Sequence, residues 1–254
     1  MTVGLVAATA GQEGIAGTSS PAAGFIEVFD DRDWRRNWYL SNFDMGPKFV
    51  TGWREDLIGD DGPGRVVLSL EPGAEDKSFL GAEIQRAGGH HFGSYEVIMR
   101  PGRGDGLVSA FFTYTGPYFE DPHDEIDFEF LGRDTTRVWL NVFTAGKQLG
   151  GRWLELGFDA AAAPHLYRFE WSPQEIVWYV DGTELSRLTI SEHPIPITPG
   201  RLFVNIWAGT PGMTDWLAAP AEDLAARAQV HCVSYRPTGA PGTECSDLPD
   251  GTWR

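Results

Sequence analysis

The sequence predicts an all-β protein, a sandwich of two antiparallel sheets. Short runs of alternating apolar and polar residues recur along the chain, with turn signals every ten residues or so. Helical periodicity is nearly absent, and the 254 residues contain neither an internal repeat nor a dividing linker. Many short strands with regular turn signals are typical of a sandwich. We therefore expect a single domain at 25–254, behind a flexible lead at 1–24.

The lead and the first half of the domain differ in composition. Residues 1–24 are rich in Gly, Ala, Ser and Thr and contain no Lys or Arg. This composition is consistent with a flexible terminus that has no function, and equally with an altered secretion signal that lacks its basic segment. Alternation then predicts strands at 25–28, 66–70, 79–86, 93–100 and 107–114.

The next expected strand, DEIDFEFLG at 124–132, carries an unusual charge pattern. Successive side chains of a strand point to opposite faces. Glu125, Asp127 and Glu129 therefore share one face, and three apolar residues fill the other. One interpretation is a solvent-exposed acidic strand face without function. The fully apolar opposite face and the spacing of the three carboxylates favour a catalytic role instead.

Two carboxyl groups on one face suit glycosidic bond cleavage. Retaining glycosidases hold a nucleophile and an acid/base roughly 5–5.5 Å apart. On an ideal strand at ~3.3 Å per residue, the backbones of Glu125 and Glu129 are about 13 Å apart. Two long side chains on a concave, twisted sheet can lean together to close that gap. The charge of Asp127 between them opposes ionisation of both, which can keep one carboxyl protonated near neutral pH.

The second half of the chain continues the strand pattern. Strands are expected at 136–144, 166–171, 176–180, 183–187, 201–207 and 230–236. Asp181-Gly182 predicts a type I′ hairpin turn between two of them. The Ala-rich segment 221–228 is the one predicted helix.

Composition narrows the class of partner. A net charge of −16, from 20 basic and 36 acidic residues, argues against nucleic acid and anionic membrane surfaces and permits a neutral polysaccharide. No apolar run is long enough to insert into a membrane. The 10 Trp residues supply flat faces that suit either a core or sugar stacking. Cys232 and Cys245 would form a disulfide in an exported protein, which we favour, and remain two thiols in a cytosolic one.

The run EIDFEFLG at 125–132 resembles the active-site strand of glycoside hydrolase family 16, in the branch without an extra bulge residue. That branch contains lichenases (endo-β-1,3-1,4-glucanases), succinoglycan-type endoglycanases and xyloglucan endotransglycosylases. Further similar stretches follow in family order, so the resemblance covers about residues 25–236; they lie at 106–117, 133–144, 157–160, 165–171, 176–182, 205–210 and 215–217. The resemblance implies a jelly-roll (concanavalin-like) sandwich with a concave glycan-binding cleft.

The resemblance also implies residue roles. Glu125 would be the nucleophile, Glu129 the acid/base, and Asp127 the group that orients Glu125 and balances the proton between the pair. Trp207 would be a stacking platform beside the donor sugars. The implied substrate-binding residues are Glu83, Phe112, Tyr114, His123, Asn141, Phe143, Asn205, Trp207 and Trp216.

Two departures from the lichenase pattern matter. His123 stands where lichenases typically have Trp, and a His can hydrogen-bond a sugar or a carboxylate where Trp would stack. The aspartate associated with a structural calcium appears here as His231, a poor ligand for this hard cation. We therefore expect no required cofactor and no catalytic metal, and a structural calcium is doubtful.

The sequence thus predicts a secreted or periplasmic, monomeric, retaining endo-β-glycanase, similar to a β-1,3-1,4-glucanase, that cuts inside a β-glucan through a glycosyl–Glu125 intermediate. A transglycosylase acting on a β-glucan or xyloglucan-type chain is the first alternative. A non-catalytic glycan-binding jelly roll is the second. Loops 41–54 and 117–123, on which linkage preference depends, match no branch of the family well.

Overall fold

The computed structural model describes residues 23–30, 33–62, 64–74, 76–149 and 151–249. Most of the expected lead, residues 1–22, therefore lies outside the described residues. The first strand, β1, begins at Phe25, as predicted.

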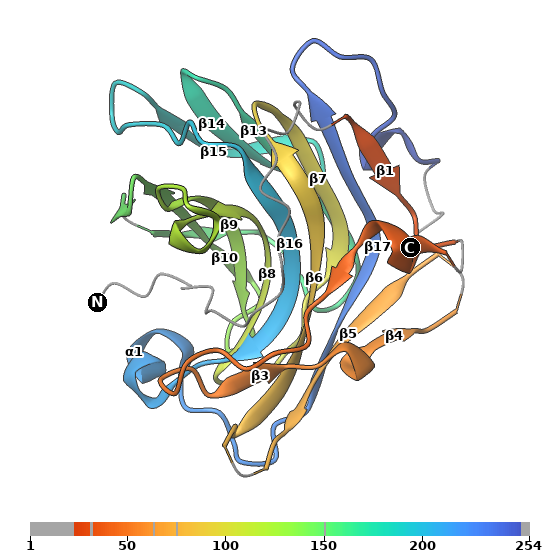
Figure 1. The fold of residues 1–254 in the computed structure, drawn as a ribbon, viewed down its shortest axis with the longest axis vertical. Coiled ribbons are helices and arrows are strands. Elements are labelled where there is room, and N and C mark those ends of the chain that lie inside the picture. Colours follow the sequence, from red (N-terminus) through yellow and green to blue (C-terminus); the bar gives the residue numbers. More distant parts are fainter. Residues whose placement is uncertain (1–22, 31–32, 63, 75, 150, 250–254) are drawn as a thin grey trace.

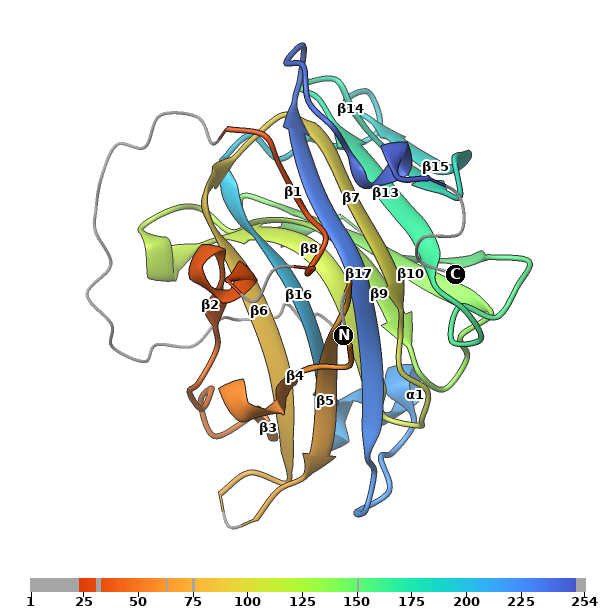
Figure 2. The same ribbon diagram turned by 90° about the vertical axis from the view of Figure 1, so that its right-hand side faces the viewer.

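Two curved sheets make up the fold (Figures 1 and 2). The outer sheet runs β15-β14-β13-β7-β17, with β5 and β1 pairing along the free edge of β17 and β4 beside β5. Its strands are β1 (Phe25–Glu27), β4 (Ile58–Asp60), β5 (Val66–Pro72), β7 (Gly93–Arg100), β13 (His165–Trp171), β14 (Glu175–Val180), β15 (Thr183–Thr189) and β17 (Ala226–Pro237).

The inner sheet runs β10-β9-β8-β16-β6. Short strands extend both edges, and β5 also pairs with the start of β6, which connects the two sheets. In the described part of the chain, only the pairing of β3 with β6 is parallel. The strands of this sheet are β2 (Tyr39–Leu40), β3 (Thr51–Trp53), β6 (Phe79–His90), β8 (Leu107–Thr115), β9 (Asp124–Leu131), β10 (Arg137–Thr144), β11 (Lys147–Gln148), β12 (Arg152–Glu155) and β16 (Gly200–Ala208).

The main core fills the space between the sheets. On β9, Phe128 and Phe130 are completely buried and contact Tyr167 of β13 at ring-centroid distances of 5.7 and 4.5 Å. Ile126 belongs to the same cluster. The apolar face of β9 therefore points to the outer sheet, and its three carboxylates point to the opposite, concave side. This confirms the jelly-roll sandwich and the alternation predicted for 124–132.

The described helices are short, and the predicted helix at 221–228 is wrong. Residues 221–225 form a turn and loop, and Ala226 and Ala228 already pair with Leu70 and Leu68 of β5. Edge pairing with a buried strand outweighs the modest helix preference of alanine. The helices are α1 (Thr214–Leu217) and the 3₁₀ turns Trp34–Asn37, Glu55–Leu57, Pro117–Phe119, Pro211–Met213 and Cys245–Asp247.

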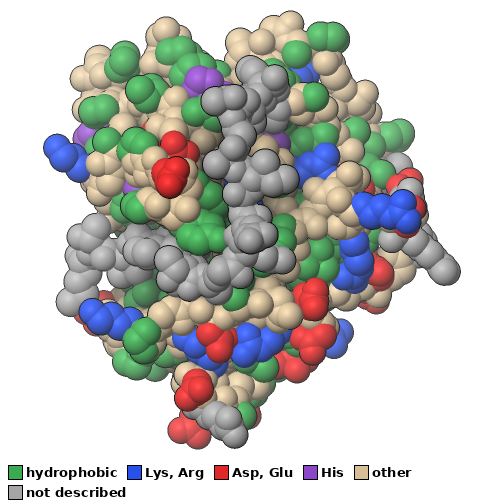
Figure 3. Space-filling view, in the orientation of Figure 1, with side chains coloured by type: hydrophobic (Ala, Val, Ile, Leu, Met, Phe, Trp, Pro, Cys, Tyr) green, Lys and Arg blue, Asp and Glu red, His purple; other side chains and the backbone are tan. Residues whose placement is uncertain are grey.

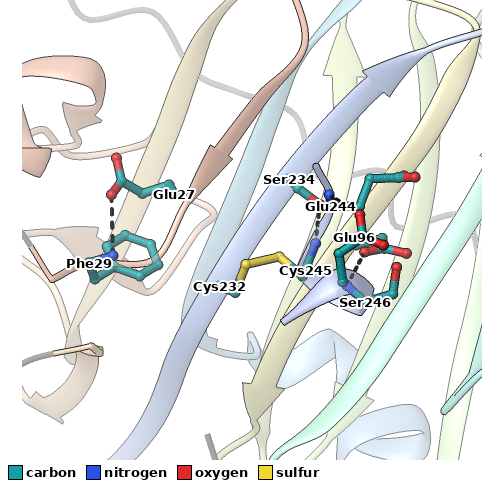
Figure 4. The surroundings of a disulfide bond; sticks show 9 residues. Glu27, Phe29, Glu96, Cys232, Ser234, Glu244, Cys245 and Ser246 are labelled. Atoms are coloured by element: carbon teal, nitrogen blue, oxygen red, sulfur yellow. Dashed lines mark hydrogen bonds between the residues drawn. A yellow bond between two sulfur atoms is a disulfide. The ribbon is translucent and has the colours of Figure 1, made fainter. Parts of the chain in front are cut away.

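Two local predictions are confirmed. Asp181 and Gly182 have φ values of 47° and 78°, the left-handed pair that a type I′ turn requires between β14 and β15. Cys232 and Cys245 form a disulfide that fixes the C-terminal segment to β17 of the outer sheet (Figure 4). Nearby, the backbone N–H of Ser246 donates to Glu96 at 2.8 Å.

The described helices and the charges on one face of the molecule can be compared with the composition. None of the helices in the described part of the chain has the length and apolar character needed to span a bilayer. Acidic and basic side chains are intermixed along the lower part of the face seen in Figure 3, rather than separated into a basic patch.

Candidate active site

The registers of the inner sheet place the site residues in rows that cross the strands. Directly paired residues of antiparallel strands project from the same face. One row runs from Glu83 on β6 through Asn205, Ala110 and Glu129 to Trp139 on β10. This row lies on the concave face, across five adjacent strands.

Two parallel rows contain the other carboxylates. Asp127 lies between Phe112 of β8 and Asn141 of β10. Glu125 lies between Tyr114 and Phe143 on the same two strands. The structure therefore brings together the predicted triad and its predicted neighbours from strands β8 and β10.

Hydrogen bonds that favour the anion distinguish Glu125 from Glu129. Its Oε2 accepts from His123 Nε2 at 2.6 Å, and Asp127 donates a second hydrogen bond to it. The His123 ring stacks on Phe143, with centroids 4.3 Å apart. The cleft histidine thus contacts a carboxylate, one of the two roles expected for it, and is held in that position by an aromatic ring.

Burial raises the pKa values of all three carboxyls, and repulsion by neighbouring carboxylates adds to the rise for Asp127 and Glu129. Glu125 is 3% exposed, and loss of water raises its pKa, but the two hydrogen bonds and the charge of His123 oppose that rise. Burial and the charges of Glu125 and Glu129 raise the pKa of Asp127 well above its usual value. Burial, with the charge of Glu125, raises the pKa of Glu129 to about 8. Glu125 is thus the group best stabilised as an anion, and Glu129 keeps a proton at neutral pH.

Comparison with known proteins identifies the family. The family model described as glycosyl hydrolases family 16 matches residues 46–226. A β-glucanase of Bacillus amyloliquefaciens is 40% identical over 211 residues, which cover 81% of this chain and 85% of the relative. The chain belongs to glycosyl hydrolase family 16.

Solved structures agree with this assignment. A β-1,3-1,4-glucanase (lichenase) from a mouse hindgut metagenome superposes with a TM-score of 0.79 at 37% identity, covering 85% of this chain and all of that one. The Bacillus licheniformis β-glucanase gives the same TM-score at 36% identity, covering 85% of this chain and 99% of the other. This family 16 protein is therefore a glycoside hydrolase, an endo-β-glucanase with the jelly-roll fold of those structures.

On one side of the triad, the family 16 cleft has a buried polar cluster. Glu83, 4% exposed, accepts hydrogen bonds from Ser41 at 2.7 Å, Gln85 at 2.9 Å and Asn205 at 3.1 Å. Burial raises its pKa. Between Asn205 and Glu129 the row holds only Ala110, whose small side chain leaves room above the sheet. The predicted sugar contacts of Glu83 and Asn205 fit this position and stay predictions.

The two predicted tryptophans differ in accessibility. Trp207 is 1% exposed, and its ring lies against Phe49, with centroids 5.3 Å apart. The ring is therefore buried against the segment before β3, and its role as a stacking platform stays a prediction. Trp216 is half-buried and lines a cavity.

The site also contains residues that sequence reasoning missed. A cavity of about 440 Å³ adjoins Glu129, and Trp139, Trp153 and Gln148 line it. Trp139 lies two residues before Asn141, so period-2 alternation on β10 would have placed it on the same face. Trp153 gave no such signal, because β12 reaches the cleft only through its pairing with β10.

The residues present at the position expected for calcium do not suit that ion. Burial and the positive charges of Arg65 and Arg100 lower the pKa of His231 to about 4. A site that disfavours one positive charge also disfavours a divalent cation. Within the described ranges, no group of three or more His, Cys, Asp or Glu side chains is placed to hold a metal.

Proposed function

We propose that this enzyme hydrolyses internal bonds of a β-1,3-1,4-glucan with retention of anomeric configuration. The single observation that supports it is the unequal treatment of two glutamates on one strand face. Glu125 receives two hydrogen bonds that favour its anion, whereas Glu129 has a pKa of about 8 and holds a proton. A nucleophile and an acid in this arrangement are what a retaining glycosidase needs.

The proposed reaction has two steps. In the first, Glu125 attacks the anomeric carbon while Glu129 protonates the departing glycosidic oxygen, which leaves a glycosyl ester on Glu125. In the second, Glu129 takes a proton from water, whose oxygen attacks the same carbon and releases the Glu125 carboxylate. Asp127 donates its hydrogen bond to Glu125 and so keeps the nucleophile oriented between the steps.

Azide rescue tests both roles. Glu125→Ala and Glu129→Ala are compared with the parent on barley β-glucan and on a dinitrophenyl β-cellobioside, with added sodium azide. We expect α-glycosyl azide from Glu125→Ala, because azide replaces the nucleophile, and β-glycosyl azide from Glu129→Ala, because azide attacks the glycosyl ester. Glu184→Gln, an exposed carboxylate of the outer sheet, is the control. Full activity of Glu125→Ala without azide would refute the assignment.

The substrate rests on the similarity to β-glucanases. Laminarin, xyloglucan and succinoglycan, compared with barley β-glucan at equal mass concentration, test it. We expect a kcat/KM at least tenfold higher on barley β-glucan. A preference for any of the others would overturn the proposed substrate and leave the proposed chemistry in place.

We also propose that the protein acts outside the cytoplasm. The Cys232–Cys245 disulfide supports this, because such bonds persist in oxidising compartments and are rare in reducing ones. Thiol labelling of protein taken from the producing cells and from the medium checks it. Two free thiols in the native protein, with activity confined to the cytoplasm, would contradict it.

A further inference from the structure

Arg201 is a cation on the concave side of the inner sheet, in the same cross-strand row as the proposed nucleophile. It pairs with Tyr114 of β8, and Tyr114 pairs with Glu125 of β9. Leu202 and Val204, the alternate residues of β16, are fully buried between the sheets, so the Arg201 side chain projects to the concave side. Arg201 therefore lies two strands from Glu125, roughly 10 Å at ~4.8 Å per strand.

The pairing of β16 with β6 is interrupted at Arg201. Gly200 pairs with His90 and Leu202 with Arg86, and the register shifts between these two pairs, so β6 has no partner for Arg201 itself. Such irregularities re-aim a side chain and are frequent beside active sites. Arg201 is only partly buried, and a ligand in the cleft can reach it.

An aromatic ring holds the guanidinium, and no acid balances it. The guanidinium carbon of Arg201 lies 4.4 Å from the ring centroid of Phe119, in the turn that precedes β9. Burial lowers the pKa of Arg201, and within the described residues the groups that oppose this change are the phenols of Tyr118 and Tyr39 rather than a carboxylate. A partly desolvated cation is costly unless an anion compensates it.

Arg168 of the outer sheet provides the contrast. Its guanidinium also lies over an aromatic ring, 4.1 Å from the centroid of Tyr179. Unlike Arg201, it has two carboxylates within reach, Glu96 at 3.9 Å and Glu170 at 3.5 Å. Stacking uses only the flat face of a guanidinium and leaves its N–H edge for an anion. At Arg201 that edge has no protein carboxylate to bind.

A carboxylate is the anion that suits Arg201 best. Two parallel N–H groups of a guanidinium match the two oxygens of one carboxylate. The net charge of −16 repels a polymer with an acid on every sugar. The site therefore fits a mostly neutral glycan that carries occasional carboxylates.

We propose that Arg201 binds a carboxylate carried by one sugar of the substrate, so that the enzyme prefers to cut a β-glucan at a fixed distance from an acidic unit. The inference rests on the proposed function, because the cleft must hold a β-glucan chain. Two strands at ~4.8 Å each place the acidic unit about two or three sugars from the cut bond. Arg201 acts on specificity and does not contact the reacting atoms.

The positions of the cuts test the proposal. Barley β-glucan with a small fraction of its primary hydroxyls oxidised to carboxylate is digested beside untreated glucan, and the products are sequenced by mass spectrometry. We expect the parent to cut bonds at one distance from a carboxylate about tenfold more often than bonds remote from any carboxylate, the effect of one hydrogen bond between charged groups. Added NaCl should weaken this preference, because salt screens the attraction.

Three variants isolate the guanidinium. Arg201→Gln should lose the preference. Arg201→Lys should keep a weaker one, because an ammonium is a point charge without the paired N–H edge. Arg168→Gln, which removes a guanidinium stacked on a ring in the outer sheet, should leave the preference unchanged.

The controls separate the possible failures. Melting temperatures show whether each variant is folded, and an unfolded Arg201→Gln leaves the decision to Arg201→Lys. Random cutting of oxidised glucan by the parent, or the parent's full preference in a folded Arg201 variant, overturns the carboxylate site and leaves the hydrolase standing. Failure of the parent to cut untreated barley β-glucan removes the proposed function, and this inference with it.

Discussion

The hydrogen bond from His123 to Glu125 should set the acid limit of activity. The two side chains are 15% and 3% exposed, and the bond is 2.6 Å long. A hydrogen bond to a charged group contributes about 1.5–3 kcal/mol. Since one pKa unit corresponds to about 1.36 kcal/mol, its loss is worth about 1–2 units.

The direction of the pKa change follows from which form of Glu125 the hydrogen bond stabilises. The hydrogen bond and the charge of His123 both favour ionised Glu125 and so lower its pKa. Removing them raises that pKa, and the nucleophile is then lost to protonation at higher pH. In His123→Ala the acid limb of kcat/KM, which reports the free enzyme, should move up by about 1–2 pH units. His123→Gln, which keeps a donor without charge, should move it less.

Initial rates on dinitrophenyl β-cellobioside between pH 4 and 9 measure this limb. His165→Ala is a matched control, because His165 makes a 2.6 Å hydrogen bond to Asp181 outside the cleft. Melting temperatures separate lost packing on Phe143 from lost ionisation. If His123→Ala raises KM while the acid limb stays in place, His123 contacts only sugar, and the reasoning about Glu125 is wrong.

Three further outcomes are expected. The pKa of Glu129, about 8, should place the alkaline limb of kcat/KM near that pH, because the acid loses its proton as the pH rises through this value. In Glu129→Gln that limb should vanish, and kcat on barley β-glucan should fall about 10²–10⁴-fold. An alkaline limb that survives in this variant would argue for another acid. Replacing Cys232 and Cys245 by Ser should lower the unfolding free energy by about 3 kcal/mol in a urea titration, because the bridge closes a short loop, with kcat/KM at 25 °C unchanged on the distant inner sheet. An unchanged urea midpoint would contradict this. Phe128→Ala should cost about 3–5 kcal/mol in the same titration, because the ring is fully buried between the sheets, and a loss below 1 kcal/mol would show that the core collapses around the gap.

Sequence reasoning brought the three proposed catalytic residues together because they all lie on one strand. Alternation alone put Glu125, Asp127 and Glu129 on one face, and the structure shows the apolar partners of that strand buried against the outer sheet. The Asp181-Gly182 turn was equally readable, since it depends on two adjacent residues. Local patterns of this kind can be predicted from the sequence because no contact with a distant segment competes with them.

The failures all concern contacts between distant segments. Ala226 and Ala228 favoured a helix until pairing with β5 offered them a buried edge. The contact between Trp207 and Phe49, which comes from much earlier in the chain, was not anticipated either. Trp153 joins the site only because β12 pairs with β10. None of these contacts leaves a periodic signal in the segment concerned.

Under the proposed function, a glycan lies across the row from Glu83 to Trp139, so that each strand of the inner sheet provides one position along the sugar chain. Neighbouring strands lie ~4.8 Å apart, a distance close to the length of one hexose ring, so each strand faces about one sugar of a chain laid across it. A substitution on a single strand, such as Ala110→Val, is then expected to weaken the binding of one sugar and to leave the binding of the next sugar unchanged. The length of glycan that the enzyme reads would depend on how many strands the sheet contains.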